Sequence, residues 1–289
     1  MRYREEAVVF DCKGDQLVGV ATLALAEENP SACTGVVVVV GGPQYRAGSH
    51  RQFVLLARHL AATGIPVLRF DYRGMGDSTG GQRAFEDVND DIACAIGALC
   101  SVATNVKNVA LWGLCDGASA ALLYCHAVRD DRVVGLCLLN PWVRSEATLA
   151  RTQVKHYYTQ RLRQKEFWNK LLSGKVAWNA LTGLANNLKL ALSTSTAGVT
   201  TAQLSFQDRM AAAWMAFDGP ILLLLSGDDY TAKEFLEYVA SNTVWFQALT
   251  KENLVLQTVV GADHTFSEIR FSLIVEKCTY DFLSNLAFH

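Results

Sequence analysis

One cysteine stands between two glycines at a point where a buried strand gives way to a helix of small residues. Within NVALWGLCDGASAALLY (108–124), Gly113, Cys115 and Gly117 have the spacing of a G-x-S-x-G nucleophile elbow, with cysteine in place of serine. The glycines let strand and helix approach closely, and a thiol at a helix N-terminus ionises more readily. We therefore predict that Cys115 is a nucleophile and not an inert packed thiol.

A nucleophilic thiol needs a general base and an acid that orients the base. Of the six histidines, only His264 follows a predicted strand, in VVGADH. The acid should end a strand between Cys115 and His264. The strand that ends at Asn140 offers no carboxylate, whereas LLLLSGDD ends in Asp228 and Asp229. Adjacent residues of an extended chain point in opposite directions, so we expect one of these two to serve.

Acyl transfer also needs two backbone N–H groups that face the developing oxyanion. The first should be the N–H of Asp116, directly after the cysteine. The second should come from the loop GGPQYRAG, where Pro43 has no N–H, so Gly42 or Gln44 is expected to supply it. Ser49, in the same loop, is interpreted as the N-cap of the next helix and not as a catalytic group.

The elements that must position these groups follow an alternating pattern of strands and helices. Residues 6–25 alternate as an antiparallel hairpin does, which suits a sheet edge. We interpret 70–80, which contains Asp71 and Ser78, as a structural turn packed beside the elbow. Six aliphatic runs are typical of strands buried on both faces of a parallel sheet: 35–42, 66–74, 108–115, 133–141, 220–229 and 253–264. The predicted fold class is α/β, a doubly wound, mostly parallel sheet, with ligands bound beyond the carboxyl ends of its strands.

One connection is far longer than a crossover helix requires. About 80 residues separate Asn140 from Pro220. We expect a helical lid over 141–216, with the catalytic core formed by 1–140 and 217–289. Between residues 144 and 175 this segment has eight basic and two acidic residues. Its Arg151 and Lys155, with Arg46 from the oxyanion loop, are expected to form a cationic rim that binds an anionic substrate, the alternative being a solvated helix face.

Composition excludes several other classes of protein. The chain has 289 residues, 51% hydrophobic and 19% charged, and a net charge of −2, which gives no general attraction to nucleic acid or anionic membranes. No apolar run is long enough to span a membrane, and no signal peptide is evident. Eight cysteines without a regular framework predict reduced thiols and a cytoplasmic location. We find no zinc- or calcium-ligand pattern and no nucleotide motif, so no metal or cofactor is expected.

Together these residues resemble the α/β-hydrolases, which share the elbow, the stretch Asp71 to Ser78, a strand-terminal aspartate and a late histidine. GGPQYRAGSHRQF, ARTQVKHYYTQRL, SGDDYTAKEF and ADHTFS are similar to bacterial exosortase A system-associated hydrolases of type 1, which are encoded beside exopolysaccharide machinery. That resemblance implies a bacterial cytoplasmic enzyme with a lid. Matched to its G-x-D-x-T-A motif, Asp229 is the acid, with Asp228 as the alternative. The cysteine is similar to that of dienelactone hydrolases.

The function predicted from these residues is cleavage of an ester or thioester through an acyl-enzyme, and the resemblance implies a link to exopolysaccharide biosynthesis. His264 would deprotonate Cys115, and the thiolate would attack the acyl carbon. The substrate would be a small acyl ester or thioester, whose acyl group could be linked to a carrier or a saccharide. One alternative is an acyltransferase that uses the same acyl-enzyme. The other is a binding protein that keeps the fold without turnover, although such a protein needs neither His264 nor an aspartate beside it. The oligomeric state is not predicted.

Overall fold

The protein is known from a computed structural model, which describes residues 3–25, 33–42, 45–144 and 204–286. The chain divides into two compact units, Met1–Trp142 with Leu204–His289, and Val143–Gln203. The first unit contains every element discussed below. Nearly all of the second unit lies outside the described residues, and so does the first predicted lid helix.

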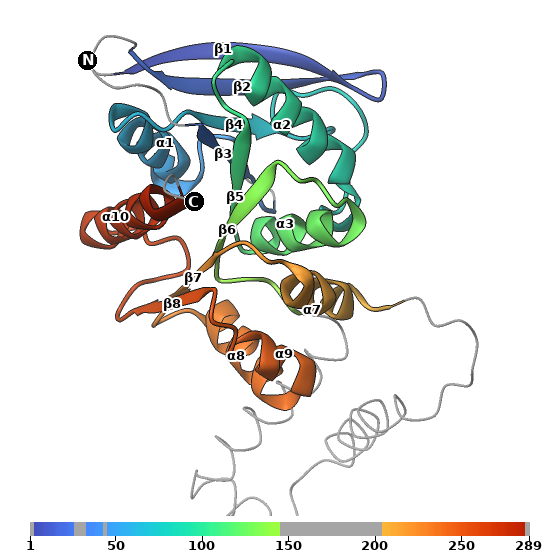
Figure 1. The fold of residues 1–289 in the computed structure, drawn as a ribbon, viewed down its shortest axis with the longest axis vertical. Helices are drawn as coiled ribbons and strands as arrows, with labels where there is room; N and C mark the ends of the chain where they lie inside the picture. Colours follow the sequence, from blue (N-terminus) through green and yellow to red (C-terminus); the bar gives the residue numbers. More distant parts are fainter. Residues whose placement is uncertain (1–2, 26–32, 43–44, 145–203, 287–289) are drawn as a thin grey trace, which may run out of the picture. The chain divides into compact units, whose positions relative to one another are not determined.

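Within the described residues, eight strands form a single sheet in the order β1-β2-β4-β3-β5-β6-β7-β8 (Figure 1). β1 and β2 form an antiparallel hairpin at one edge, β2 also pairs antiparallel with β4, and all other neighbours are parallel. The predicted doubly wound, mostly parallel sheet is therefore confirmed. The strands are β1 (Tyr3–Cys12), β2 (Asp15–Ala24), β3 (Thr34–Val39), β4 (Val67–Asp71), β5 (Asn108–Leu114), β6 (Val133–Leu139), β7 (Ile221–Ser226) and β8 (Leu254–Val259).

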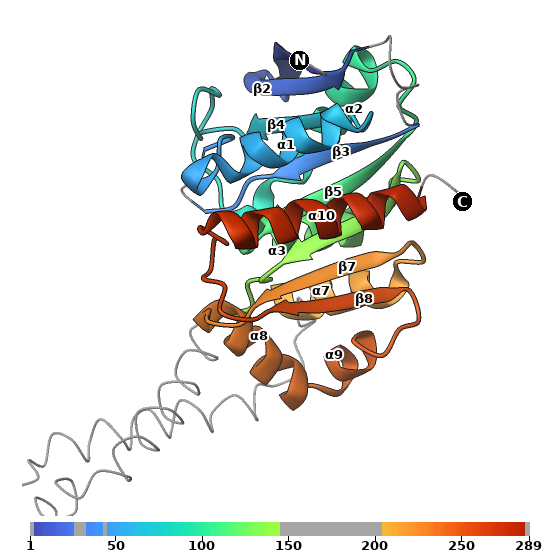
Figure 2. The same ribbon diagram turned by 90° about the vertical axis from the view of Figure 1, so that its left-hand side faces the viewer.

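Helices cover both faces of the sheet. α1 and α10 lie on one face, and α2, α3 and α7 lie on the other (Figures 1 and 2). α8 and α9 connect β7 to β8. The helices are α1 (Gln52–Ala62), α2 (Asn89–Val102), α3 (Asp116–Ala127), α7 (Phe206–Ala216), α8 (Tyr230–Ser241), α9 (Thr243–Ala248) and α10 (Ile269–Leu286), with short 3₁₀ turns η1 (Ser49–Arg51) and η2 (Phe85–Asp87).

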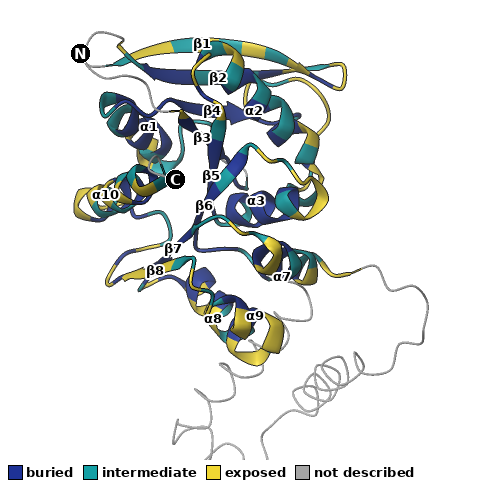
Figure 3. Ribbon diagram, in the orientation of Figure 1, coloured by how far each residue is buried: buried dark blue, intermediate teal, exposed yellow. Residues whose placement is uncertain are grey.

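The central strands are buried on both faces, as their aliphatic runs predict (Figure 3). β8 differs from the prediction. It was expected to be buried on both faces, yet Val255 and Leu256 are 53% and 47% exposed. In the part of the chain that the structure describes, β8 lies at the edge of the sheet beside β7. An apolar run therefore identified the strand correctly but not its position in the sheet.

α7 requires a correction to the predicted lid. The long connection predicts a lid over 141–216 that would include α7, whereas the structure places α7 in the first unit, which resumes at Leu204. Met210 and Trp214 are fully buried. The Trp214 ring lies 6.5 Å from that of Phe235 and 5.6 Å from that of Trp245, between ring centroids. The apolar face of α7 thus packs into the core of the first unit, whereas the lid itself lies outside the described residues and stays a prediction.

Three further observations bear on the predicted class of protein. None of the described helices is long and apolar enough to cross a membrane. All eight cysteines, each of them in the described part of the chain, are free. Within the same residues, no group of three or more His, Cys, Asp or Glu side chains is arranged to hold a metal ion.

Candidate active site

Cys115 occupies a strained turn between β5 and α3. Its backbone has φ 60° and ψ −126°, a region that side-chain-bearing residues rarely adopt. Two backbone hydrogen bonds fix the turn: Cys115 N donates to Leu139 O at 2.8 Å, and Ala118 N donates to Cys115 O at 3.0 Å. This geometry is that of a nucleophile elbow, because it holds the side chain at the end of the strand.

Both glycines of the elbow are needed because the chain is crowded there. A Cβ on Gly113 would lie 2.5 Å from the backbone of Gly117. A Cβ on Gly117 would lie 2.4 Å from the carbonyl oxygen of Val39, at the end of β3. Real Cβ atoms do not approach other atoms this closely, so any larger residue would push α3 away from β3 and β5.

The structure brings Asp229, and not Asp228, to His264. Nδ1 of His264 lies 2.8 Å from Oδ2 of Asp229. The Asp229 side chain is 9% exposed, whereas Asp228 is an exposed residue. Asp229 also caps α8, since the same oxygen accepts a hydrogen bond from Ala232 N at 3.1 Å. One carboxylate therefore holds both the helix N-terminus and the imidazole.

The electrostatics of this group favour a charged imidazole. Hydrogen bonds with Asp229 and with the thiol of Cys115 raise the pKa of His264 to about 10, against the opposing effect of burial. Burial alone would raise the pKa of Asp229, but the hydrogen bond and charge of His264 hold it below the usual value. Because Asp229 engages Nδ1, Nε2 is the nitrogen left for Cys115. The arrangement can hold an imidazolium between a carboxylate and a thiol.

Asn140 is a residue of this site that the sequence reasoning missed. It follows β6 with φ 44° and is fully buried. Its Nδ2 donates to the carbonyl oxygen of His264 at 3.0 Å and to Ser226 Oγ at 2.8 Å, and its Oδ1 accepts from Ser226 N at 2.8 Å. Ser226 Oγ in turn donates to Asp263 O at 2.8 Å. The sequence carried one signal: two neighbouring buried strands both end in a small polar residue.

The oxyanion loop carries a contact that sequence reasoning did not foresee. The N–H of Gly42 donates to Oδ2 of Asp116 at 2.7 Å. Asp116 and Gly42, two of the expected donors, therefore lie side by side, but the side chain of one engages the N–H of the other. Gln44, the other candidate donor, lies outside the described residues.

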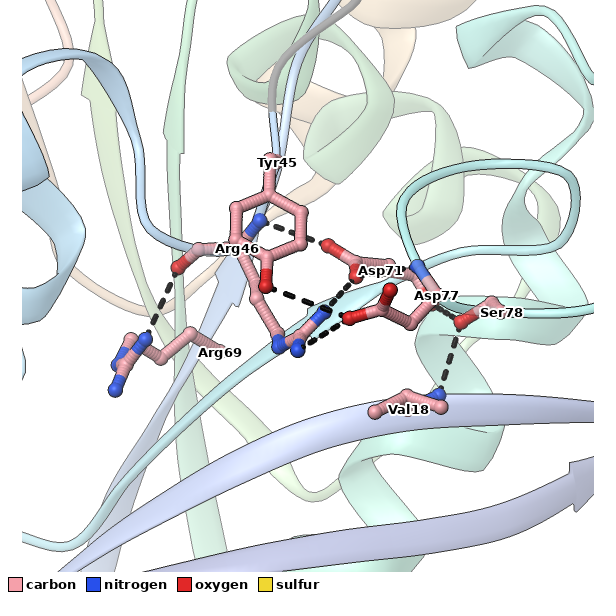
Figure 4. Close-up of polar contacts among 7 residues, drawn as sticks. All are labelled: Val18, Tyr45, Arg46, Arg69, Asp71, Asp77 and Ser78. Carbon is pink, nitrogen blue, oxygen red and sulfur yellow. Dashed lines mark hydrogen bonds and ion pairs between the residues drawn. The ribbon is translucent and has the colours of Figure 1, made fainter.

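Arg46 does not present a free charge to a substrate (Figure 4). Its guanidinium is 12% exposed and pairs with Asp71 and, at 2.6 Å, with Asp77. Asp71 is fully buried and also accepts from Arg46 N at 2.7 Å. These contacts argue against Arg46 as part of a cationic rim, because its charge is already matched by two carboxylates. Arg151 and Lys155, the other expected members of that rim, lie outside the described residues.

The turn at 70–80 has the structural role expected of it. Ser78 Oγ donates to Asp71 O at 2.6 Å and accepts from Val18 N at 2.9 Å, which joins the turn to β2 (Figure 4). Gly76 has φ 52°, and a Cβ there would lie 2.1 Å from the Asp71 carboxylate. Both polar side chains are therefore used in holding the loops around the elbow.

The sheet order, the crossover helices and the strand–Cys115–helix turn define the chain as an α/β-hydrolase in fold. It belongs to the family described as "Serine aminopeptidase, S33", whose sequence model matches residues 31–250. That match includes the elbow and Asp229 and ends before His264. The description of this family names serine, whereas this chain has a cysteine, Cys115, at the elbow.

Known proteins are similar to this chain in sequence or in fold. Human protein ABHD12B is 32% identical over 147 residues, which cover 47% of this chain and 38% of that protein. The esterase Pf2001 of Pyrococcus furiosus superposes with a TM-score of 0.63 at 17% identity, covering 98% of this chain and 93% of that one. Est1E of Butyrivibrio proteoclasticus, solved with ferulic acid, gives 0.59 at 15% identity, covering 96% and 100%.

Proposed function

We propose that this protein cleaves an ester or thioester through an acyl-enzyme on Cys115, with His264 as base and acid and Asp229 as the residue that orients it. The observation that carries the proposal is the shared geometry of these three residues. His264 meets the Asp229 carboxylate at 2.8 Å, and Cys115, which sits on a strained elbow, lies near enough to His264 to help raise the pKa of its imidazole.

In the first step, the Cys115 thiolate forms an S–C bond to the acyl carbon, and the carbonyl electron pair moves onto oxygen. The N–H of Asp116 and an N–H of the oxyanion loop, from Gly42 or Gln44, would stabilise that oxyanion. The intermediate then expels an alkoxide or thiolate, which takes the proton of the His264 imidazolium. The acyl group is now held as a thioester of the protein.

In the second step, neutral His264 takes a proton from water while the water oxygen attacks the thioester carbon. Collapse of this intermediate releases the carboxylic acid, and Cys115 leaves as a thiolate beside the imidazolium. Esters and thioesters suit this chemistry better than amides, because a thiolate leaves a tetrahedral intermediate more readily than an unprotonated amine. This is why we propose an esterase or thioesterase in a family whose description names a peptidase.

The test is detection of the acyl-enzyme by intact mass after mixing with p-nitrophenyl esters, acyl thioesters and acylated saccharides. We expect a mass increase of one acyl group that maps to Cys115, and turnover that disappears in Cys115→Ala. Cys33→Ala is the matched control, because Cys33 is an exposed thiol in front of β3. Iodoacetamide should also label Cys115 faster than the other seven cysteines.

Two other outcomes have separate meanings. An acyl-enzyme that transfers its acyl group to an added amine or sugar faster than to water would make the protein an acyltransferase. If the Cys115 thiol is intact and none of these substrates acylates it, the proposal is wrong and a non-catalytic binding protein remains. The exopolysaccharide link rests on the sequence resemblance alone and stays a prediction, which the acylated saccharides of the substrate set address.

A further inference from the structure

The carboxylate of Asp116 lies against the backbone that would form the oxyanion hole. Its Oδ2 accepts the N–H of Gly42 at 2.7 Å. Its Oδ1 sits so close to Gly41 that a Cβ on that glycine would be 2.2 Å away. The side chain thus folds back over the end of the strand β3 and fills the space that the two loop glycines leave open.

The Gly42 N–H that it binds is one of the groups expected to serve the reaction. A carboxylate oxygen and a tetrahedral oxyanion are both negatively charged acceptors of backbone N–H groups, so they compete for the same donors. The resting site therefore already holds an acidic side chain of its own at the Gly42 N–H.

We propose that the Asp116 carboxylate is an internal ligand of the oxyanion hole, which a substrate carbonyl oxygen must displace before Cys115 can be acylated. The proposal rests on the proposed function, since it deepens the account of the same site. In this role Asp116 slows the acylation of Cys115. It also favours substrates whose carbonyl oxygen can displace the carboxylate from the Gly42 N–H. Rotation about its own side-chain bonds is enough to free the Gly42 N–H, and no covalent step is involved.

The surroundings of the Asp116 carboxylate have opposing effects on its negative charge. Burial raises the pKa of the Asp116 carboxyl, while the amides of Gly42, Asp116 and Gly117 and the charge of His264 act in the opposite direction. Tyr72, at the end of β4, feels the same anion, because burial and then the charge of Asp116 raise its pKa. Removing the carboxylate should therefore leave the loop donors available without breaking an ion pair between side chains.

The experiment compares two reactions of the same thiol. Acylation of Cys115 by p-nitrophenyl acetate develops an oxyanion, whereas alkylation by iodoacetamide displaces iodide and develops none at a carbonyl. The ratio of the two rate constants therefore reports the oxyanion hole and cancels general changes in the reactivity of the thiol. It is measured in the wild type, in Asp116→Ala and in Asp116→Asn, with Asp131→Asn as a control that removes an exposed carboxylate elsewhere.

We expect the ratio to rise about tenfold in Asp116→Ala and less in Asp116→Asn, whose amide oxygen still accepts the Gly42 N–H without a charge. Asp131→Asn should leave it unchanged. A ratio that stays the same or falls in both Asp116 variants, with the wild type acylated, overturns this inference alone. If neither the wild type nor the variants are acylated while alkylation proceeds, the proposed function fails and the inference fails with it.

Discussion

At the scale of single residues, the cysteine and the histidine suit each other. With the pKa of His264 raised to about 10, the imidazole carries a proton at neutral pH. A protonated imidazole cannot serve as the initial base for a serine hydroxyl, whose own proton is held far more tightly. A cysteine can instead release its proton in advance and pair as a thiolate with the imidazolium. Cysteine at the elbow is thus consistent with the charge state that Asp229 imposes on His264.

Asp229→Asn tests that link directly. We expect the pKa of His264, followed by NMR of the imidazole protons, to fall towards its ordinary value of about 6.5, because the negative partner is lost. Turnover of an activated ester should fall by on the order of 100-fold or more as the imidazole loses its orientation. Asp228→Asn, which alters the exposed neighbour, should change both quantities little. The opposite ranking of the two variants would move the orienting role to Asp228.

The loss of unfolding free energy in Asp229→Asn should depend on pH. The pKa of His264 is raised on folding, so its contribution is complete below about 6.5 and is lost as the pH rises through about 10. The pKa of Asp229 is lowered, so its contribution is present above 3.8 and is lost as the pH falls below that value. The difference in unfolding free energy between wild type and Asp229→Asn should therefore be largest between about pH 4 and 6.5, as denaturant titrations can measure.

At the scale of elements, the loop ends of β6, β7 and β8 are tied to one another. Asn140 joins the end of β6 to Ser226 on β7 and to the backbone of His264 beyond β8. Neither Asn140 nor Ser226 reaches the reacting atoms, so they act as positioning residues. Through them, the parallel sheet fixes where the loop that carries His264 lies.

Asn140→Ala should disturb this arrangement in two ways. It leaves Ser226 N and His264 O without their partner, which should cost about 2–3 kcal/mol of unfolding free energy. It should also slow iodoacetamide labelling of Cys115 and shift the pKa of His264, because the imidazole loop is released. Asn242→Ala is the matched control: it removes the N-cap of α9 and should cost about 1 kcal/mol without altering either readout. Equal loss of stability with unchanged labelling would make Asn140 purely structural.

The sequence predicted the parts of the site that depend on local pattern. The glycine spacing placed the expected elbow at Cys115, and the ends of aliphatic runs pointed to His264 and to the pair Asp228 and Asp229, between which the family resemblance selected Asp229. The sequence did not predict features that depend on contacts between distant parts of the chain. Ser49 was expected to cap α1, yet His50 and Arg51 adopt left-handed conformations and no side chain caps that helix. Likewise Arg46 is a cation in the sequence, but only the fold shows the two carboxylates that match it.

At the scale of the whole first unit, the sheet places the candidate catalytic residues beyond the carboxyl ends of neighbouring strands. Cys115 follows β5, Asn140 follows β6, Asp229 follows β7 and His264 follows β8, so four neighbouring parallel strands each contribute from their carboxyl ends. α3 and α7 lie on one face of these strands, and α10 lies on the other (Figures 1 and 2). The precision of the site therefore depends on how firmly those helices are packed against β5 to β8.

α7 is the element whose role in that packing differs most from expectation, and its core face can be tested. Trp214 is fully buried between Phe235 of α8 and Trp245 of α9, so Trp214→Ala should leave a large cavity and lower the unfolding free energy by about 3–5 kcal/mol. Its neighbour Met215 is 38% exposed, and Met215→Ala should cost no more than about 0.5 kcal/mol. Both are measured by urea titration. If α7 belonged to a separate lid, both substitutions would lower the unfolding free energy by the same small amount, because the lid would not take part in the cooperative unfolding of the sheet.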